Sequence, residues 1–253
     1  VGYLSDRWHL WRSEWDAISL WNERGAITVG STASASSDFA TSLTYAFNNV
    51  AGDFMWTLCA NDRSGSGTTI DTITYAAAGL TLQTALGSGG RATRMGHRVA
   101  PATGSNNVVQ TNSTTNTKPM SESISYLGVD QVTPISDVQT LNTTASDATW
   151  TVASATGDFV CAGAITTTAG QAFTPGTDTN ERLQVDFTGV GSGFFADEPG
   201  GASITINETM TSAVVGGYAF SLKAAGGGAP ATTVFRQMIS STMRPGSRPM
   251  GAA

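Results

Sequence analysis

The sequence predicts an all-β fold: an antiparallel, jelly-roll-like β-sandwich with an N-terminal amphipathic helix and an extended C-terminal tail. From Asp38 onward, about ten to twelve short runs rich in β-branched and aromatic residues alternate with Gly, Asn, Ser and Asp turns. Clear helical periodicity is confined to the first 25 residues. The end of the chain is too poor in apolar residues to fold alone. We therefore expect four segments: an arm (1–25), a linker (26–37), a β-sandwich (38–223) and a tail (224–253).

The N-terminal arm carries one apolar stripe, which predicts its helix. The stripe consists of Leu4, Trp8, Trp11, Trp15 and Ile18, and it is widened by Trp21. Spacings of four and three place such residues on one face of a helix. Ser5 is a suitable N-cap, and Gly25 can take the left-handed conformation that ends a helix after Arg24.

This stripe carries a large apolar surface that favours burial against protein, because each Trp side chain buries about 150–250 Å² when it is covered. A helix lying on a membrane would be rich in Lys and Arg, whereas the first 37 residues hold three Arg against four acidic residues. Two destinations remain open. The stripe packs on its own sandwich, or it enters a groove on another subunit.

Residues 26–37 begin like a strand and continue as small residues typical of a linker. The region after them contains a faint internal repeat. LTYAFNNVAGDF, which ends at Phe54, aligns with ATWTVASATGDF, which ends at Phe159, at an offset of 105 residues. We expect Asp53 and Asp158 to cap backbone amides in their turns.

The repeat has two interpretations. The halves are either the two Greek-key halves of one jelly roll or two separate small sandwiches. We favour one jelly roll, because no evident linker divides the halves.

The tail begins with a flexible Gly- and Ala-rich hinge and contains Arg236, Arg244 and Arg248 without any acidic residue. These cations either dock on an acidic neighbour or remain in solvent. Together with the stripe of the arm, they are our candidate partner-binding residues.

The charge balance excludes some partners. Residues 38–223 hold seven basic and fifteen acidic side chains, and this acidic body argues against nucleic acid. No run of 18 apolar residues is present, so we expect no membrane span. Cys59 and Cys161 lie in apolar runs, which favours buried thiols.

The sequence offers no constellation for catalysis, and we expect a protein that is not an enzyme and that binds no cofactor. No nucleophile elbow, P-loop or dinucleotide fingerprint is present. Asp186, Asp197 and Glu198 offer oxygen ligands of the kind that Ca²⁺ prefers, but their spacing matches no EF-hand, so we expect no metal site.

Two groups are candidate ligand contacts. The first is a basic group of Arg91, Arg94 and Arg98, for which a solvated loop is the plain alternative. The second is Phe194 and Phe195, an aromatic pair in a Gly-rich stretch that looks exposed.

The Thr-, Gly- and Ala-rich body, the GDF turns, the stretch YLGVDQVTPI and the closing GYAFSLKAA together resemble β-sandwich proteins of tailed-bacteriophage virions. The resemblance covers roughly residues 38–225. It implies a head-decoration, minor-capsid or tail-appendage role in an extracellular particle assembled in the host cytoplasm. Its partners would be other virion proteins and copies of the chain itself, with a trimer as one closed arrangement. The alternative is a lectin-like carbohydrate-binding module for host-surface adhesion, with a glycan as partner.

Overall fold

The computed structural model describes residues 26–50, 52–62, 68–88, 91–114 and 117–226. These residues form antiparallel β-sheets without a helix, which confirms the all-β prediction for this part of the chain. Consistently, no helix long and apolar enough to cross a membrane occurs within it. The predicted N-terminal helix and most of the predicted tail lie outside the described residues.

The N-terminal half of the β-body has two sheets. One has the order β1-β10-β3-β8-β6, with β7 also paired to β8, and the other has the order β2-β9-β4-β5. The strands are β1 (Thr28–Ser36), β2 (Ser42–Asn49), β3 (Phe54–Asp62), β4 (Ile70–Tyr75), β5 (Ala78–Gly79), β6 (Thr81–Leu82), β7 (Leu86–Ser88), β8 (Arg91–Val99), β9 (Gly104–Asn112) and β10 (Lys118–Leu127).

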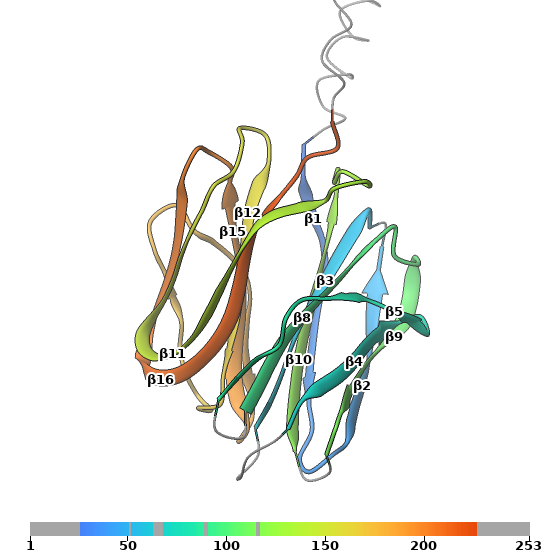
Figure 1. The fold of residues 1–253 in the computed structure, drawn as a ribbon, viewed down its shortest axis with the longest axis vertical. Coiled ribbons are helices and arrows are strands. Elements are labelled where there is room, and N and C mark those ends of the chain that lie inside the picture. Colours follow the sequence, from blue (N-terminus) through green and yellow to red (C-terminus); the bar gives the residue numbers. More distant parts are fainter. Residues whose placement is uncertain (1–25, 51, 63–67, 89–90, 115–116, 227–253) are drawn as a thin grey trace, which may run out of the picture. The chain divides into compact units, whose positions relative to one another are not determined.

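The C-terminal half is one sheet with the order β11-β16-β12-β15-β14, with β13 also paired to β16. Its strands are β11 (Ile135–Val152), β12 (Phe159–Thr166), β13 (Thr174–Pro175), β14 (Asn180–Phe187), β15 (Gly191–Pro199) and β16 (Ile204–Leu222). The long strands β11 and β16 pair along their whole length, with a register shift between Ala145 and Asp147. At this irregularity both strands turn back, as Figure 1 shows. The sheet thereby folds over itself, and the Ala153 amide donates to the Asp137 carboxylate of the same β11 region.

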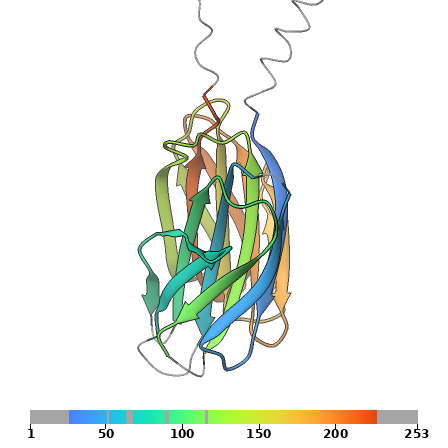
Figure 2. The same cartoon turned by 90° about the vertical axis from the view of Figure 1, so that its right-hand side faces the viewer.

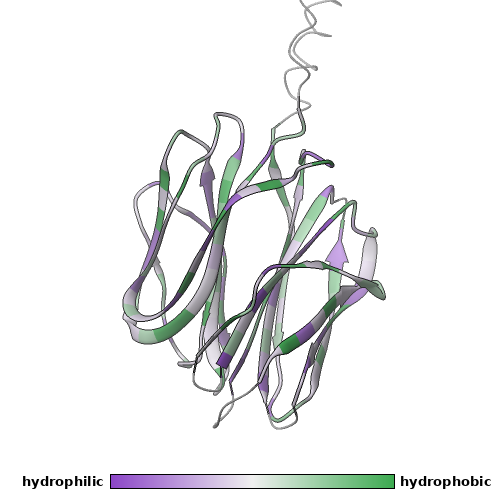
Figure 3. Cartoon of the chain, viewed as in Figure 1, coloured by the Kyte–Doolittle hydropathy of each residue, from purple (hydrophilic) through white to green (hydrophobic). Residues whose placement is uncertain are grey.

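Strand β3 lies in a layer that is covered on both sides by other sheets. Its run of apolar residues has both faces buried, as expected for a strand in a central layer. Phe54, Trp56 and Leu58 face the C-terminal half, whereas Met55 and Cys59 face the sheet of β2, β4 and β9. Elsewhere hydrophobic and hydrophilic residues alternate along many strands (Figure 3), which is the pattern of half-buried sheets.

The two halves have the same topology. Strands β1 and β2 correspond to the first part (135–145) and second part (147–152) of β11. In the same way β3 corresponds to β12, β8 to β15, β9 to the first part of β16 (204–209), and β10 to its second part (213–222). The faint sequence repeat is therefore a structural repeat. The single jelly roll that we favoured is wrong, because each half builds its own pair of layers with its own core.

The repeated aspartates confirm this equivalence. Asp53 Oδ2 accepts a hydrogen bond from the Gly128 amide at 2.7 Å, and Asp158 Oδ1 accepts one from the Ala224 amide at 2.9 Å. Both amides follow the last strand of their half. The carboxylates do cap backbone amides, as predicted, but these amides belong to a distant strand end rather than to the turn itself.

The predicted linker (26–37) is wrong, because residues 28–36 form β1 at the edge of a sheet. The small residues that suggested a linker allow close packing: a Cβ atom on Gly30 would lie 2.6 Å from Ser125 Oγ on β10. The sandwich therefore begins about ten residues earlier than the predicted boundary at Asp38.

The halves pack on each other through equivalent faces. Each contact between two strands therefore has a counterpart between the corresponding strands. β1 contacts β14, and the corresponding strands β11 and β7 also touch. Glu122 lies against Gly193, where a Cβ atom would be 2.9 Å from Glu122 Oε2. At the corresponding positions the Tyr218 hydroxyl donates to the Thr93 carbonyl at 3.2 Å. The chain thus packs like a homodimer whose two subunits have been fused.

Candidate functional site: a polar network between the halves

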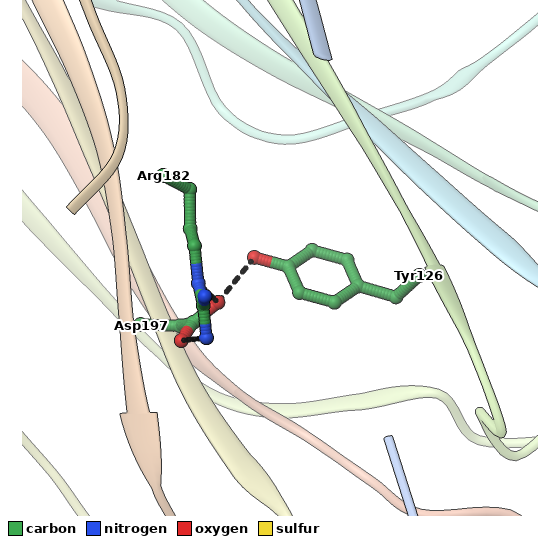
Figure 4. A network of polar contacts seen from close by, with 3 residues as sticks. All are labelled: Tyr126, Arg182 and Asp197. Atoms are coloured by element: carbon green, nitrogen blue, oxygen red, sulfur yellow. Dashed lines mark hydrogen bonds and ion pairs between the residues drawn. The ribbon is translucent and has the colours of Figure 1, made fainter. Parts of the chain in front are cut away.

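A buried ion pair of the described β-body, with the tyrosine that bonds to it, lies where the two halves meet (Figure 4). Arg182 on β14 donates from Nε to Asp197 Oδ2 and from Nη2 to Asp197 Oδ1, both at 2.8 Å. Tyr126 on β10, in the other half, donates its hydroxyl to Asp197 Oδ2 at 3.3 Å. One carboxylate therefore accepts bonds from both halves.

Burial controls the protonation of this network. Asp197 is fully buried, whereas about a third of the Arg182 side chain is exposed. Burial raises the pKa of Asp197, and the bonds from Arg182 oppose that rise; the same bonds raise the pKa of the guanidinium. Burial raises the pKa of Tyr126 well above its usual value, so its hydroxyl keeps the proton that it donates.

The arrangement of these three side chains holds neighbouring strands in place. A bidentate guanidinium–carboxylate pair is geometrically specific, so it holds β14 and β15 at one offset. Cys161 lies in the same interface, where burial raises the pKa of its thiol well above its usual value. A protonated thiol is a poor nucleophile. The network therefore links β10 of one half to β14 and β15 of the other.

Two further titratable groups lie in this interface. Glu122 is fully buried, and neither carboxyl oxygen has a hydrogen-bond partner among the described residues. Burial raises its pKa well above the usual value, which favours the neutral acid. His97 stacks on Phe54 with ring centroids 5.7 Å apart, and burial lowers its pKa, which favours neutral imidazole.

The predicted basic group does not form one patch. Because side chains alternate along β8, Arg91 faces the opposite side of the sheet from Arg94 and Arg98. Arg91 is buried and donates to Asn142 Oδ1 at 3.0 Å. Arg94 donates to the carbonyl oxygens of Gln83 at 3.0 Å and Ile70 at 2.8 Å. Two of the three guanidinium groups therefore bond within the β-body.

The predicted aromatic contact is wrong. Phe194 and Phe195 are fully buried on β15, where alternation sends them to different cores. Phe195 packs on Trp56 with centroids 4.3 Å apart, and Phe194 packs on Phe173 at 4.8 Å. The Gly-rich flanks suggested a loop, but here glycine allows close approach of strands.

The three acids weighed as a Ca²⁺ site have separate partners. Asp186 accepts from the Gly170 amide, Glu198 accepts from the Thr179 hydroxyl, and Asp197 pairs with Arg182. In the part of the chain that the structure describes, no group of three or more His, Cys, Asp or Glu side chains is placed to hold a metal ion.

Sequence reasoning did not find Tyr126, Arg182 or Glu122. A signal for Glu122 was present: period-two alternation places it on the face of β10 that carries the apolar side chains of Met120, Ile124 and Tyr126. No local pattern links Tyr126 to Arg182. The candidate partner-binding residues of the arm and the tail lie outside the described residues.

Comparison with known proteins gives no match: no protein-family model, no curated protein and no solved structure is significantly similar to this chain.

Proposed function

We propose that this chain is a non-enzymatic structural protein of a larger assembly, in which the two chain ends attach a rigid β-body to neighbouring subunits. The particle that the sequence resemblance indicates is the virion of a tailed bacteriophage. Its partners would then be other virion proteins and further copies of the chain.

The observation that carries this proposal is the common exit of the chain ends from the β-body. The Ala225 amide donates to the Gly128 carbonyl at 2.7 Å. A Cβ atom on Gly128 would lie 2.5 Å from the Ala26 carbonyl oxygen, and the positive φ of 74° also favours glycine there. The described chain therefore begins and ends on either side of one residue, at one end of the β-body (Figures 1 and 2).

This placement supports attachment at one end. Two segments that start side by side can engage a single neighbour together, so the second binds at a high effective concentration. The stripe of Trp8, Trp11 and Trp15 would supply apolar contact area, and the tail cations would supply charge complementarity.

The carbohydrate-binding alternative has less support, because its predicted platform, Phe194 and Phe195, is buried. Phe39 is the exposed aromatic side chain of the described residues, at 67% exposure, with Lys118 Nζ 5.8 Å from its ring centroid. A single ring offers little stacking surface. We therefore retain attachment as the proposal, and glycan binding is an outcome of its test.

The proposal is tested by comparing the full chain with a variant in which Trp8, Trp11 and Trp15 are replaced by Gln. We expect the full chain to assemble or to co-sediment with particles in its native host cell. The variant should remain monomeric, with an unchanged β-sheet circular dichroism spectrum. Ultracentrifugation with light scattering measures both states.

A Phe39→Ala variant is the matched control, because it also removes an aromatic ring but leaves the arm intact. It should assemble like the full chain. Monomeric full chain at high concentration, or undiminished assembly of the Trp variant, would show that the arm is not the attachment element. Binding to a glycan array that is lost in Phe39→Ala would favour the carbohydrate alternative.

A further inference from the structure

Strand β2 lies at the edge of the sheet β2-β9-β4-β5 and has a neighbouring strand on one side only (Figure 1). It pairs with β9 through eight consecutive residues, from Ser42 opposite Thr111 to Asn49 opposite Gly104, without a register shift. No second strand pairs with it in the described part of the chain. Such an edge presents unpaired N–H and C=O groups that can bind another strand.

The backbone groups that face away from β9 belong to alternate residues of β2. The Asn112 amide donates to the Thr41 carbonyl at 2.8 Å, just before the first residue pair of the ladder. Hydrogen-bonded and non-bonded pairs alternate in an antiparallel ladder, so every second residue counted from Thr41 bonds to β9. The residues between them direct their N–H and C=O groups to the open side: Ser42, Thr44, Ala46 and Asn48. All four are exposed.

Strand β2 lacks the features that usually protect an open edge, which are short length, bulges, charged side chains and proline. The other described edge strands have them. Register shifts interrupt β1, β11 and β14, and β14 also carries three charged side chains. Strands β5, β6, β7 and β13 have three residues or fewer. In contrast, β2 has eight residues, none of them charged and none a proline.

A second copy of the same strand fits this edge. In an antiparallel pair about a two-fold axis, Thr44 of one copy can lie opposite Ala46 of the other. Ser42 then lies opposite Asn48, so all four outward-facing residues have partners. No like charges meet along this edge, although residues 38–223 hold seven basic and fifteen acidic side chains. Most other contacts between copies would bring acidic surfaces together.

We propose that β2 binds β2 of a second copy by antiparallel strand addition, which joins the two four-stranded sheets into one. A single strand pair is a small contact beside the roughly 1,200–2,000 Å² of a stable interface. The inference therefore rests on the proposed function: the chain ends first attach the copies to one particle, and β2 then links neighbouring copies at a high effective concentration.

Disulfide trapping with the full chain tests the contact and its register. Thr44→Cys chains are mixed with Ala46→Cys chains and oxidised mildly on the particle. In the proposed register the two Cα atoms lie about 5.5 Å apart, which a disulfide can span. The mixture should form cross-linked dimer roughly tenfold faster than either chain alone, because identical positions are two residues out of register. The native Cys59 and Cys161 are buried and should not contribute.

A charged edge should prevent the contact. Ser42→Lys with Asn48→Lys places like charges directly opposite each other in the pair, which is unfavourable. This change should reduce cross-linking in the mixture to the level of the single chains. Ser105→Lys with Asn107→Lys is the matched control, because both residues are exposed on β9, which is not an edge strand. The control should cross-link like the unmodified mixture.

Co-sedimentation with particles, measured on the same samples, reports attachment by the chain ends separately. The Ser42 and Asn48 lysine variant should still co-sediment. Co-sedimentation without a cross-link in the mixture would overturn the β2 contact and leave the attachment role intact. A cross-link in chains that do not co-sediment would overturn only the role of the chain ends.

Two further results would overturn the contact. One is equal cross-linking in the two lysine variants, because the edge would then not be what brings the cysteines together. The other is slow amide hydrogen exchange at Thr44 and Ala46 in dilute full chain, because another segment of the same chain would then cover β2. We expect these amides to exchange fast in dilute solution and slowly on the particle.

Discussion

At the scale of single residues, the interface between the halves depends on glycines that face aromatic rings. Gly163 on β12 is the clearest case. A Cβ atom there would lie 2.6 Å from Phe195 and 2.7 Å from Trp56. Neither ring can retreat, because both are fully buried in close-packed surroundings. The absence of a side chain at Gly163 is therefore what lets the halves approach.

Gly163→Ala should destabilise the protein by about 1–3 kcal/mol, the usual range for overpacking a core. Gly79→Ala is the matched control, because nothing lies within 4 Å of a Cβ atom placed there. Its effect should stay within about 0.5 kcal/mol. Urea unfolding measures both values, and equal stability of the two variants would contradict the close approach.

At the scale of elements, the repeated aspartate joins the second and third strands of each half to its last strand. The turn before β3 is fixed through Asp53 to Gly128, and the turn before β12 is fixed through Asp158 to Ala224. The same turns also bind the segment after β8 or β15: Ala100 N donates to Asp53 O, and Gly200 N donates to Asp158 O. Two distant strand ends are thus tied to each GDF turn.

Asp53→Ala and Asp158→Ala should each cost about 1.5–3 kcal/mol, since each removes a charged acceptor from a partly buried amide. Asp→Asn at either position keeps an acceptor oxygen and should cost less. Asp71→Ala serves as the exposed control and should cost little. Thermal unfolding monitored by circular dichroism measures the loss of stability in each variant. Unchanged stability after replacement of only one of the two aspartates would show that the two turns are not equivalent.

At the scale of the β-body, the two halves form a pseudo-symmetric pair joined by one connection, residues 128–134. This connection is accessible, since Val132 is 87% exposed. The shared core between the halves, with Trp56, Phe195 and Phe220 at its centre, is apolar and fully buried. The association should therefore depend on the packed faces and the Tyr126–Asp197 bond rather than on the covalent connection.

A protease recognition site inserted at Val132 tests this. After cleavage, the two fragments should elute together in size-exclusion chromatography under native conditions and separate only in denaturant. The same chain before cleavage is the control. Separate elution of the fragments without denaturant would mean that the covalent connection, and not the interface, holds the halves together.

The sequence allowed the all-β class and the repeat to be predicted, because alternation and turn residues are local signals. It did not allow the arrangement of the halves to be predicted. The residues of β1 predict a linker because small residues are typical both of flexible chain and of closely packed strands. Phe194 and Phe195 predict a surface contact because their glycine neighbours indicate a loop.

The sequence by itself determined most of the strand-forming segments, the places of the GDF turns and the aspartates that cap amides, since these properties depend on residues close together in the chain. Only the tertiary structure decided that the body is two equivalent sandwiches, and that Tyr126 meets Asp197 and Arg182. It also decided that Glu208 on β16 is buried without a hydrogen-bond partner among the described residues, whereas Gln110 on β9 has two. These features depend on contacts between strands about 60 to 70 residues apart, which no local pattern encodes.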